Sequence, residues 1–303
     1  MKTPGPPIRA AGLPELAVVV SAVLWGLWWL PLRALAEAGL PGEWASFVVY
    51  GLAGACMLPF LRNLRGRLAA GGLGLLVSGG LMGLALVLWN HALLVGEVVR
   101  VVLLFYLAPV WATLLGLFVL AEPAGAWRWL AVFAGLAGAA VVLGLEGGFP
   151  LPRDMGDWTG LGAGLVFAFS VTATRRAGSV GSLEKTLVAF AVAALLAGLL
   201  APFGPFAHPT GAELLEALPL GLAIALVWIL PGTWLMLWAA GHLDPGRVSI
   251  LLLLEVVVSA ISAGSLTDEP FGLREALGCV LILLAGFAEA VPDLRRRPAA
   301  GAH

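Results

Sequence analysis

The sequence is poor in charged residues. Only 12% of its 303 residues are charged and 60% are hydrophobic, whereas a soluble domain carries roughly 25% charged and about 45–50% apolar residues. The net charge is -1, so the chain has no excess of positive charge with which to attract nucleic acid, and we expect no nucleic-acid partner. These shortages disfavour a soluble fold and predict an integral membrane protein.

Cysteine is nearly absent, and so are the common motifs of nucleotide and catalytic sites. Cys56 and Cys279 both lie inside apolar stretches, and two cysteines so far apart form no disulfide framework and no metal motif. The sequence contains no GxxxxGKS or GxxxxGKT, no HExxH, no CxxC and no GxSxG. We therefore expect no cofactor, no metal site and no ATPase, and we interpret both cysteines as small core residues.

Long apolar runs occupy almost the whole chain. A membrane-spanning helix needs roughly 20 mostly apolar residues, and ten segments meet that length. The predicted spans are 14–36, 42–61, 71–93, 97–120, 127–146, 158–176, 186–203, 216–239, 247–266 and 274–291. The first run could be read as a signal peptide cleaved near Ala34-Leu35-Ala36, but it is long enough to span a bilayer, so we interpret it as a retained helix.

Lysine and arginine are distributed unequally between the predicted loops. With the N-terminus placed in the cytoplasm, only four of the 17 basic residues fall outside, namely Arg33, Arg100, Arg153 and Arg274. Basic residues favour the cytoplasmic side of a membrane. We therefore predict a multi-pass protein of the inner, or plasma, membrane with both termini in the cytoplasm.

The chain carries an internal repeat. A shift of 147 residues places Arg100 on Arg247 and Leu104 on Leu251 without a gap, and LWGLWWLPLR, which ends at Arg33, resembles VFAFSVTATR, which ends at Arg175. We predict two five-helix repeats, residues 1–148 and 149–303. Because five is odd, the second repeat enters the membrane from the opposite side, which is the pattern of inverted-repeat transporters with a midplane binding site. Rocking of one half against the other would then give alternating access.

Glycine is abundant, with 40 residues. In an apolar chain small residues allow helix backbones to approach closely. Gly79 and Gly83, and Gly160 and Gly164, have the GxxxG spacing. Chance spacing in a glycine-rich chain is the alternative.

Several of these segments resemble a known family. AVLWGLWWLPLRAL, LAPVWATLLGLFVLAEP, SILLLLEVVVSAISAGSLTDEP and LGCVLILLAG are similar to the first, fourth, ninth and last helices of the drug/metabolite transporter superfamily, EamA type. Val256 follows Glu255 where that family often has proline. The resemblance implies a ten-helix all-α transporter of small metabolites, often an exporter of amino acids or related compounds.

Glu255 is the sharpest functional candidate. It lies within the ninth predicted helix between LLLL and VVV. A charge at the bilayer centre costs about 2.5–3.5 kcal/mol on insertion scales, and such residues often mark an ion or substrate path. We predict that Glu255 takes up and releases a proton during transport. The alternative is a neutral carboxyl group that hydrogen-bonds between helices.

Polar and aromatic residues on other helices are candidates for binding the substrate. Asn90 and His91 could bind its polar end, or they could lie at the membrane interface. Trp25, Trp28 and Trp29 lie in mid-helix, where an interfacial belt does not explain them, so they line a cavity or pack between helices. The weaker candidates are Tyr106, Phe167, Ser170, Trp228 and Trp234. Pro231 and Gly232 form a hypothetical hinge.

The predicted partners are a small-molecule substrate, protons and the lipid bilayer. Our first hypothesis is a secondary transporter that exports amino acids or related compounds by alternating access. Uptake or facilitated diffusion of an organic solute is the alternative within transport. A membrane-embedded enzyme or a helper subunit is the alternative from another class, but few polar residues are available in the core to build a catalytic site.

Overall fold

The structure is a computed structural model that describes residues 12–60, 64–96, 98–143, 152–177, 181–204, 206–266 and 271–295. Every regular element within these ranges is a helix, and no strand occurs in them. The boundary predicted between residues 148 and 149 lies outside the described residues, as do both chain ends.

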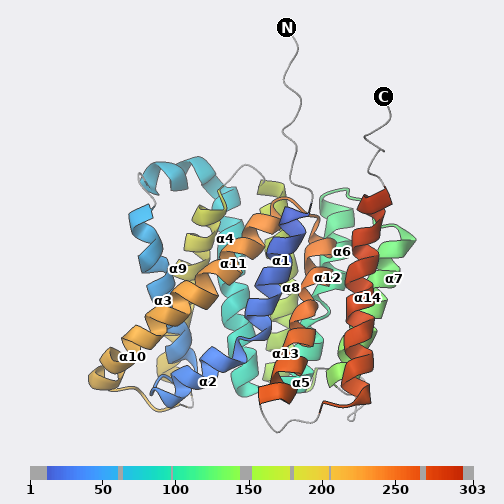
Figure 1. Cartoon of the computed structure of the whole chain (residues 1–303). Coiled ribbons are helices and arrows are strands. Elements are labelled where there is room, and N and C mark those ends of the chain that lie inside the picture. The colour runs from blue at the N-terminus through green and yellow to red at the C-terminus, as the bar shows by residue number, and fades with distance from the viewer. Residues whose placement is uncertain are drawn as a thin grey trace.

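The helices form one bundle (Figure 1). Those of the first half are α1 Leu13–Gly26, α2 Trp29–Glu37, α3 Glu43–Met57, η1 Leu58–Phe60, α4 Leu64–Val95, α5 Val98–Phe105, α6 Ala108–Val119 and α7 Ala126–Leu143. Those of the second half are α8 Met155–Ala177, α9 Ser182–Leu200, η2 Ala201–Phe203, α10 Gly211–Ile224, η3 Ala225–Ile229, α11 Leu230–Ala240, α12 Pro245–Leu252, α13 Leu254–Leu266 and α14 Leu273–Arg295.

Seven helical segments within the described residues are long and apolar enough to cross a membrane. They correspond to seven of the ten predicted spans. The other three predicted spans fall on α7, which is a shorter apolar helix, and on α8 and α14. Each of the last two has 23 residues, which at 1.5 Å per residue gives about 35 Å, more than the roughly 30 Å of a bilayer core. The protein is thus an all-helical membrane protein, and ten crossings stay a prediction.

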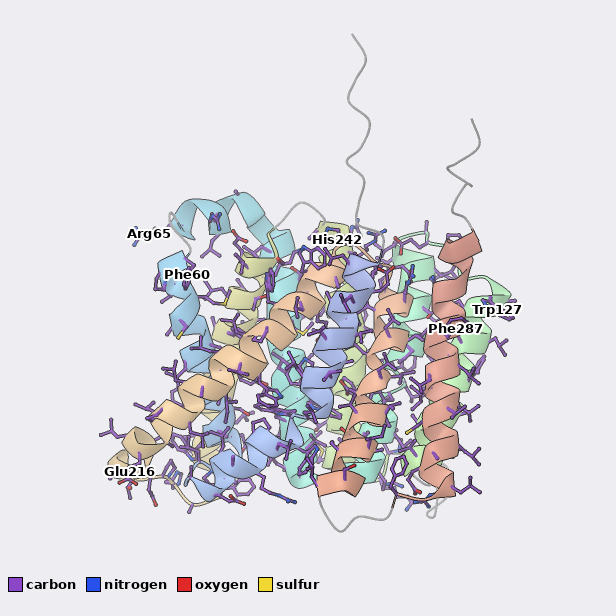
Figure 2. The ribbon with its side chains drawn as sticks, viewed as in Figure 1. Phe60, Arg65, Trp127, Glu216, His242 and Phe287 are labelled. Atoms are coloured by element: carbon purple, nitrogen blue, oxygen red, sulfur yellow. The ribbon has the colours of Figure 1, made fainter. Side chains whose placement is uncertain are left out.

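Aromatic and aliphatic side chains cover the outside of the bundle. Figure 2 shows Phe60, Trp127 and Phe287 at its periphery, and 80%, 51% and 65% of these side chains, respectively, are exposed. A soluble protein rarely exposes large contiguous apolar patches. This surface is therefore suited to contact with lipid.

Two helices are interrupted at corresponding points of the repeat. The first breaks at Tyr106 and Leu107, between α5 and α6, and the second at Leu253, between α12 and α13. The 147-residue shift places Tyr106 on Leu253. Pro109 explains the first break because it has no N–H to donate to the preceding turn. Val256 holds the equivalent place in the second copy, so that break forms without a proline.

The two broken helices run in opposite directions, as an inverted repeat requires. In Figure 1, α5 lies at the lower end and α6 above it, whereas α12 lies above α13. The start of α1 and the end of α14 lie at the same upper end.

The two repeats interlock. Helix α4 packs on α8 and α9, α3 packs on α9, α7 packs on α14, and α1 packs on α11 and α13. Most of the close packing therefore joins one sequence half to the other. Rocking of one sequence half against the other, expected from the sequence, stays a prediction.

Both GxxxG pairs lie at close helix crossings. A Cβ added at Gly79 would lie 2.6 Å from the Lys185 carbonyl oxygen, and one at Gly83 would lie 2.4 Å from that of Ala189, both on α9. A Cβ at Gly164 would lie 2.5 Å from the carbonyl oxygen of Phe105 on α5. The glycines thus let backbones of opposite repeats approach, which drives helix association in lipid.

Two ion pairs repeat at opposite ends of the bundle. Arg100 donates to Asp157 at 2.6 Å, and Arg247 pairs with Glu15 at 3.0 Å. Arg100 and Arg247 are repeat mates, and the alignment of Arg33 with Arg175, a shift of 142 residues, places Glu15 on Asp157. The same arginine–carboxylate contact therefore joins the two repeats twice, once near each end.

Candidate functional site

A cavity of about 650 Å³ lies at the centre of the bundle. Its walls come from α1, α2, α4, α5, α6, α8, α12 and α13, with contributions from α7, α11 and α14. Both repeats contribute, and the interrupted helices meet there. This volume is in the range of small-molecule sites, which span roughly 300–1,000 Å³.

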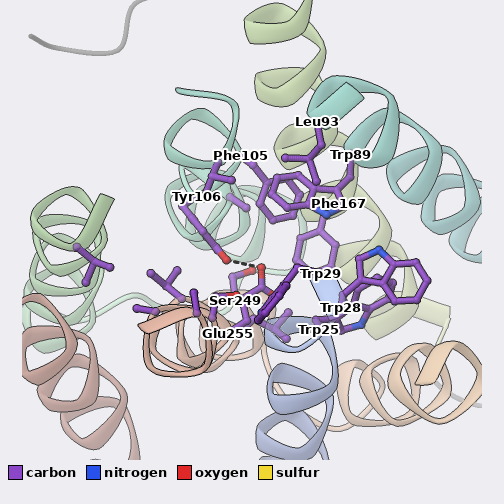
Figure 3. Close-up of a pocket in the computed structure, with 18 of the residues that line it drawn as sticks. Trp25, Trp28, Trp29, Trp89, Leu93, Phe105, Tyr106, Phe167, Ser249 and Glu255 are labelled. Atoms are coloured by element: carbon purple, nitrogen blue, oxygen red, sulfur yellow. Dashed lines mark hydrogen bonds between the residues drawn. The ribbon is translucent and has the colours of Figure 1, made fainter. Parts of the chain in front are cut away.

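Glu255 and Tyr106 connect the two interrupted helices across the cavity. The Tyr106 hydroxyl donates a hydrogen bond to Oε1 of Glu255 (Figure 3). Tyr106 stands in the break of the first repeat, and Glu255 stands two residues after the break of the second. The carboxyl group is thus held at the point where the two repeats meet.

Gly26 lets α1 approach this carboxyl-bearing helix. A Cβ at Gly26 would lie 2.7 Å from both the carbonyl oxygen of Glu255 and Cβ of Val258. The Ser259 hydroxyl donates to the Gly26 carbonyl oxygen at 2.7 Å. The chain bends directly after Gly26, between α1 and α2, and the three tryptophans on either side of this bend line the cavity.

Aromatic rings form much of the cavity wall. Trp25 and Trp28 meet edge to face with ring centroids 6.0 Å apart, and Trp29 donates from Nε1 to the Ser262 hydroxyl at 3.1 Å. On the other side Trp89 lies 4.3 Å from Phe105 between ring centroids. Figure 3 shows these rings grouped around the carboxyl group of Glu255. The wall is therefore mainly apolar, with one acidic group inside it.

Two buried polar atoms of the wall have no hydrogen-bond partner within the described part of the chain. These are Nε1 of Trp28 and the hydroxyl oxygen of Ser249. Trp28 is 4% exposed and Ser249 is 2% exposed. Buried polar groups in native proteins are normally hydrogen-bonded. Both atoms are fully buried, so neither is open to a ligand in the cavity.

Charged side chains stand at one end of the cavity. Arg33, Arg274 and Glu275 line it there, and both arginines are exposed. The guanidinium carbon of Arg33 lies 5.4 Å from the centroid of the Trp29 ring, and Arg274 pairs with Glu275 at 2.8 Å. Arg33 and Arg274 both fall in outer loops of the predicted orientation, so this end would face the outside.

The cavity brings together six of the eleven residues predicted to carry function. They are Trp25, Trp28, Trp29, Tyr106, Phe167 and Glu255.

The other five predicted residues do not line this cavity. Asn90 donates to the Ser46 hydroxyl at 2.9 Å and to the Tyr50 hydroxyl at 3.0 Å, and His91 pairs through Nδ1 with Glu43 at 2.8 Å. These contacts tie α4 to α3. Polar residues on an apolar helix can thus serve a neighbouring helix as well as a substrate.

Ser170, Trp228 and Trp234 also hold helices together. The Ser170 hydroxyl donates to the Ser78 carbonyl oxygen at 3.0 Å, and Trp228 donates to that of Leu24 at 2.9 Å. Trp234 donates to the Ser182 hydroxyl at 3.0 Å. Trp228 lies in η3, a wide helical turn just before the predicted hinge at Pro231 and Gly232.

Several cavity residues were not predicted from the sequence. Ser259 lies four residues after Glu255, so the helical period places it on the same face. Trp89 shares a face of α4 with Met82, Ala85 and Leu86, and a search for residues at this spacing could have found it. The helical period could not identify Ser249 as a cavity residue, because the break at Leu253 separates it from the face of Glu255.

Comparisons with known proteins agree with this architecture. The model of the EamA-like transporter family matches the chain twice, over residues 12–144 and 154–288. One solved structure, described as "Crystal structure of protein", superposes with a TM-score of 0.70 at 20% identity and covers 95% of this chain and 99% of its own. No curated protein sequence matches the chain significantly. The solved structure supports the fold, and the two family matches together span most of the chain, which therefore belongs to the EamA-like transporter family of membrane proteins that move small solutes.

Proposed function

We propose that this protein is a secondary transporter that moves a small organic solute across the plasma membrane by alternating access. The proposed direction is export, the proposed cargo is an amino acid or a related compound, and Glu255 is the proposed proton carrier. The observation that carries the proposal is the single carboxyl group of Glu255, held by Tyr106 between interrupted helices of opposite repeats and facing an aromatic cavity.

The proposal takes the fold as ten membrane crossings in two inverted repeats, residues 1–148 and 149–303, with both termini in the cytoplasm. An interrupted helix is tolerated at membrane depth where it lines a cavity. Substrate sites of inverted-repeat transporters lie at such interruptions near the midplane. The breaks at Tyr106 and Leu253 supply this geometry.

Glu255 suits a coupling role because of where it lies. A carboxyl group inside a membrane protein is expensive to keep charged, so proton uptake and release there can be linked to the binding of a substrate. Tyr106 offers it one hydrogen bond, and the cavity leaves room beside it for a ligand. A change in its charge would alter the contact between the two broken helices, which are the parts of the fold best placed to move.

The cavity end with Arg33 and Arg274 supports an outward-facing arrangement. At the opposite end Arg175 donates to Glu122 at 3.0 Å, joining α8 to the segment after α6. A transporter needs to exchange such closed and open ends during its cycle. The broken helices of the two repeats, α5–α6 and α12–α13, are equivalent, so they can make similar contacts when either end is closed.

Counterflow in liposomes tests the proposal. The purified protein is reconstituted, loaded with an unlabelled compound, and exposed to a panel of labelled amino acids and amines. We expect saturable exchange of one class, with a pH dependence that is lost in Glu255→Gln. Glu216→Gln, an exposed carboxylate on α10 remote from the cavity (Figure 2), serves as the matched control.

Unchanged transport and unchanged pH dependence in Glu255→Gln would refute the proton role. Absence of exchange across the whole panel would count against amino acids and amines as the cargo. Opposite ΔpH gradients in the same liposomes distinguish export from uptake.

A further inference from the structure

We infer that the cavity selects a monovalent organic cation, an amine whose ammonium group pairs with Glu255 while its apolar or aromatic body lies against the tryptophans. This inference rests on the proposed transporter function and narrows the substrate class of the same site. It favours amines without a carboxylate over amino acids.

The charges of the cavity are separated along its length. Among its described lining residues the charged ones are Glu255, Arg33, Arg274 and Glu275. Arg274 and Glu275 pair with each other, and Arg33 lies over the Trp29 ring at the exposed end. The interior beside the helix breaks therefore presents one acidic group and no described basic one.

The aromatic wall strengthens the preference for a cation. Ring faces carry negative electrostatic potential and attract ammonium groups placed within about 6 Å of the ring centroid. Trp25 and Trp28 flank Gly26, and Gly26 packs directly on the backbone of Glu255. Carboxylate and rings thus lie on touching segments, and one bound ammonium can contact both.

The Tyr106 contact does not block this pairing. A carboxylate has two oxygens and accepts several hydrogen bonds. Tyr106 is bonded to Oε1. An ammonium group with three donors can therefore bind the same carboxylate while the tyrosine holds it in place.

A zwitterion fits less well because the opposite charges of the cavity are far apart. The Arg33 guanidinium lies over the Trp29 ring, and Nε1 of that ring donates to the Ser262 hydroxyl. Ser262 lies seven residues after Glu255 on α13, which is about 10 Å along the helix at 1.5 Å per residue. An α-amino acid carries its ammonium and carboxylate on one carbon, so its carboxylate would be held beside Glu255 instead of reaching Arg33.

A matched series of three compounds tests the inference on the intact protein in detergent. Phenethylamine is a cation, phenylalanine a zwitterion and 3-phenylpropionate an anion at neutral pH, and all three carry the same ring. Isothermal titration calorimetry measures binding of each compound. We expect phenethylamine to bind at least about tenfold more tightly than the other two, since each of them brings a carboxylate that repels Glu255.

The variants Glu255→Gln and Glu216→Gln then assign the charge. The first should weaken phenethylamine binding by about tenfold or more, and the second should leave it unchanged. The selectivity of the unmodified protein tests the inference even if Glu255→Gln does not fold.

The results separate this inference from the transporter proposal. Equal or tighter binding of phenylalanine or 3-phenylpropionate, or no binding of phenethylamine, overturns the inference. Binding of phenethylamine without counterflow in liposomes leaves the cation site standing and refutes transport of this cargo. Counterflow of phenylalanine alone has the opposite meaning, because transport would stand and the cation preference would be overturned.

Discussion

Gly164→Ala should move the cavity wall by pushing two helices apart. A Cβ at this position on α8 would lie 2.5 Å from the carbonyl oxygen of Phe105 and 3.1 Å from its Cα. These are backbone atoms, so no side-chain rotation relieves the overlap. Phe105 lines the cavity and precedes Tyr106, so the shift reaches the hydrogen bond to Glu255.

The matched control is Gly162→Ala on the same helix. A Cβ there would meet no atom within 4 Å. Both substitutions gain the same helix propensity of about 1 kcal/mol, so the difference between them isolates the overlap. Overpacking costs typically 1–3 kcal/mol, and we expect Gly164→Ala to be less stable than Gly162→Ala by about that amount.

Unfolding in mixed micelles with increasing dodecyl sulfate, followed by tryptophan fluorescence, measures the free energy of unfolding of both variants. Calorimetric binding of phenethylamine measures the effect on the cavity. We expect weaker binding in Gly164→Ala only. Equal stability and equal binding of the two variants would refute the close α5–α8 crossing and its role in placing Tyr106.

Three further predictions concern the ion pairs and the two groups of predicted site residues. Asp157→Ala removes the carboxylate partner of Arg100 and should cost about 3–5 kcal/mol in the same unfolding assay, and a loss below about 1 kcal/mol would contradict a structural role. Trp28→Ala removes a ring of the cavity wall and should weaken amine binding by about 1 kcal/mol or more, as measured by calorimetry. His91→Ala removes the partner of Glu43 outside the cavity, so it should lower stability but leave amine binding within about twofold, and a selective loss of binding would restore a direct role for His91.

The apolar runs and the repeat made much of the fold predictable. Uninterrupted hydrophobic stretches have few solutions other than membrane helices, because lipid leaves backbone groups no partner outside the helix. Pro109 also marked one break, since it lacks an N–H. The break at Leu253 had no such marker, because no proline stands in the turn that follows it.

The candidate site was predictable in part for a similar reason. Glu255 and the mid-helix tryptophans stand out because a charge or a large amphipathic ring in an apolar helix is costly without a specific environment. Asn90 and His91 stand out equally in the sequence, yet they contact α3. Sequence position reveals that a polar group needs a partner and does not reveal which helix supplies it.

The sequence by itself determined the membrane class, the helix segments, the duplication and the family resemblance, because each depends on composition or on comparison of one stretch with another. Only the tertiary structure decided which helices pack together and which side chains meet. The interlocking of the repeats, the Tyr106–Glu255 contact and the paired arginine–carboxylate contacts join residues far apart in the chain. Such contacts depend on helix rotation and approach distance, which are set by the whole bundle at once.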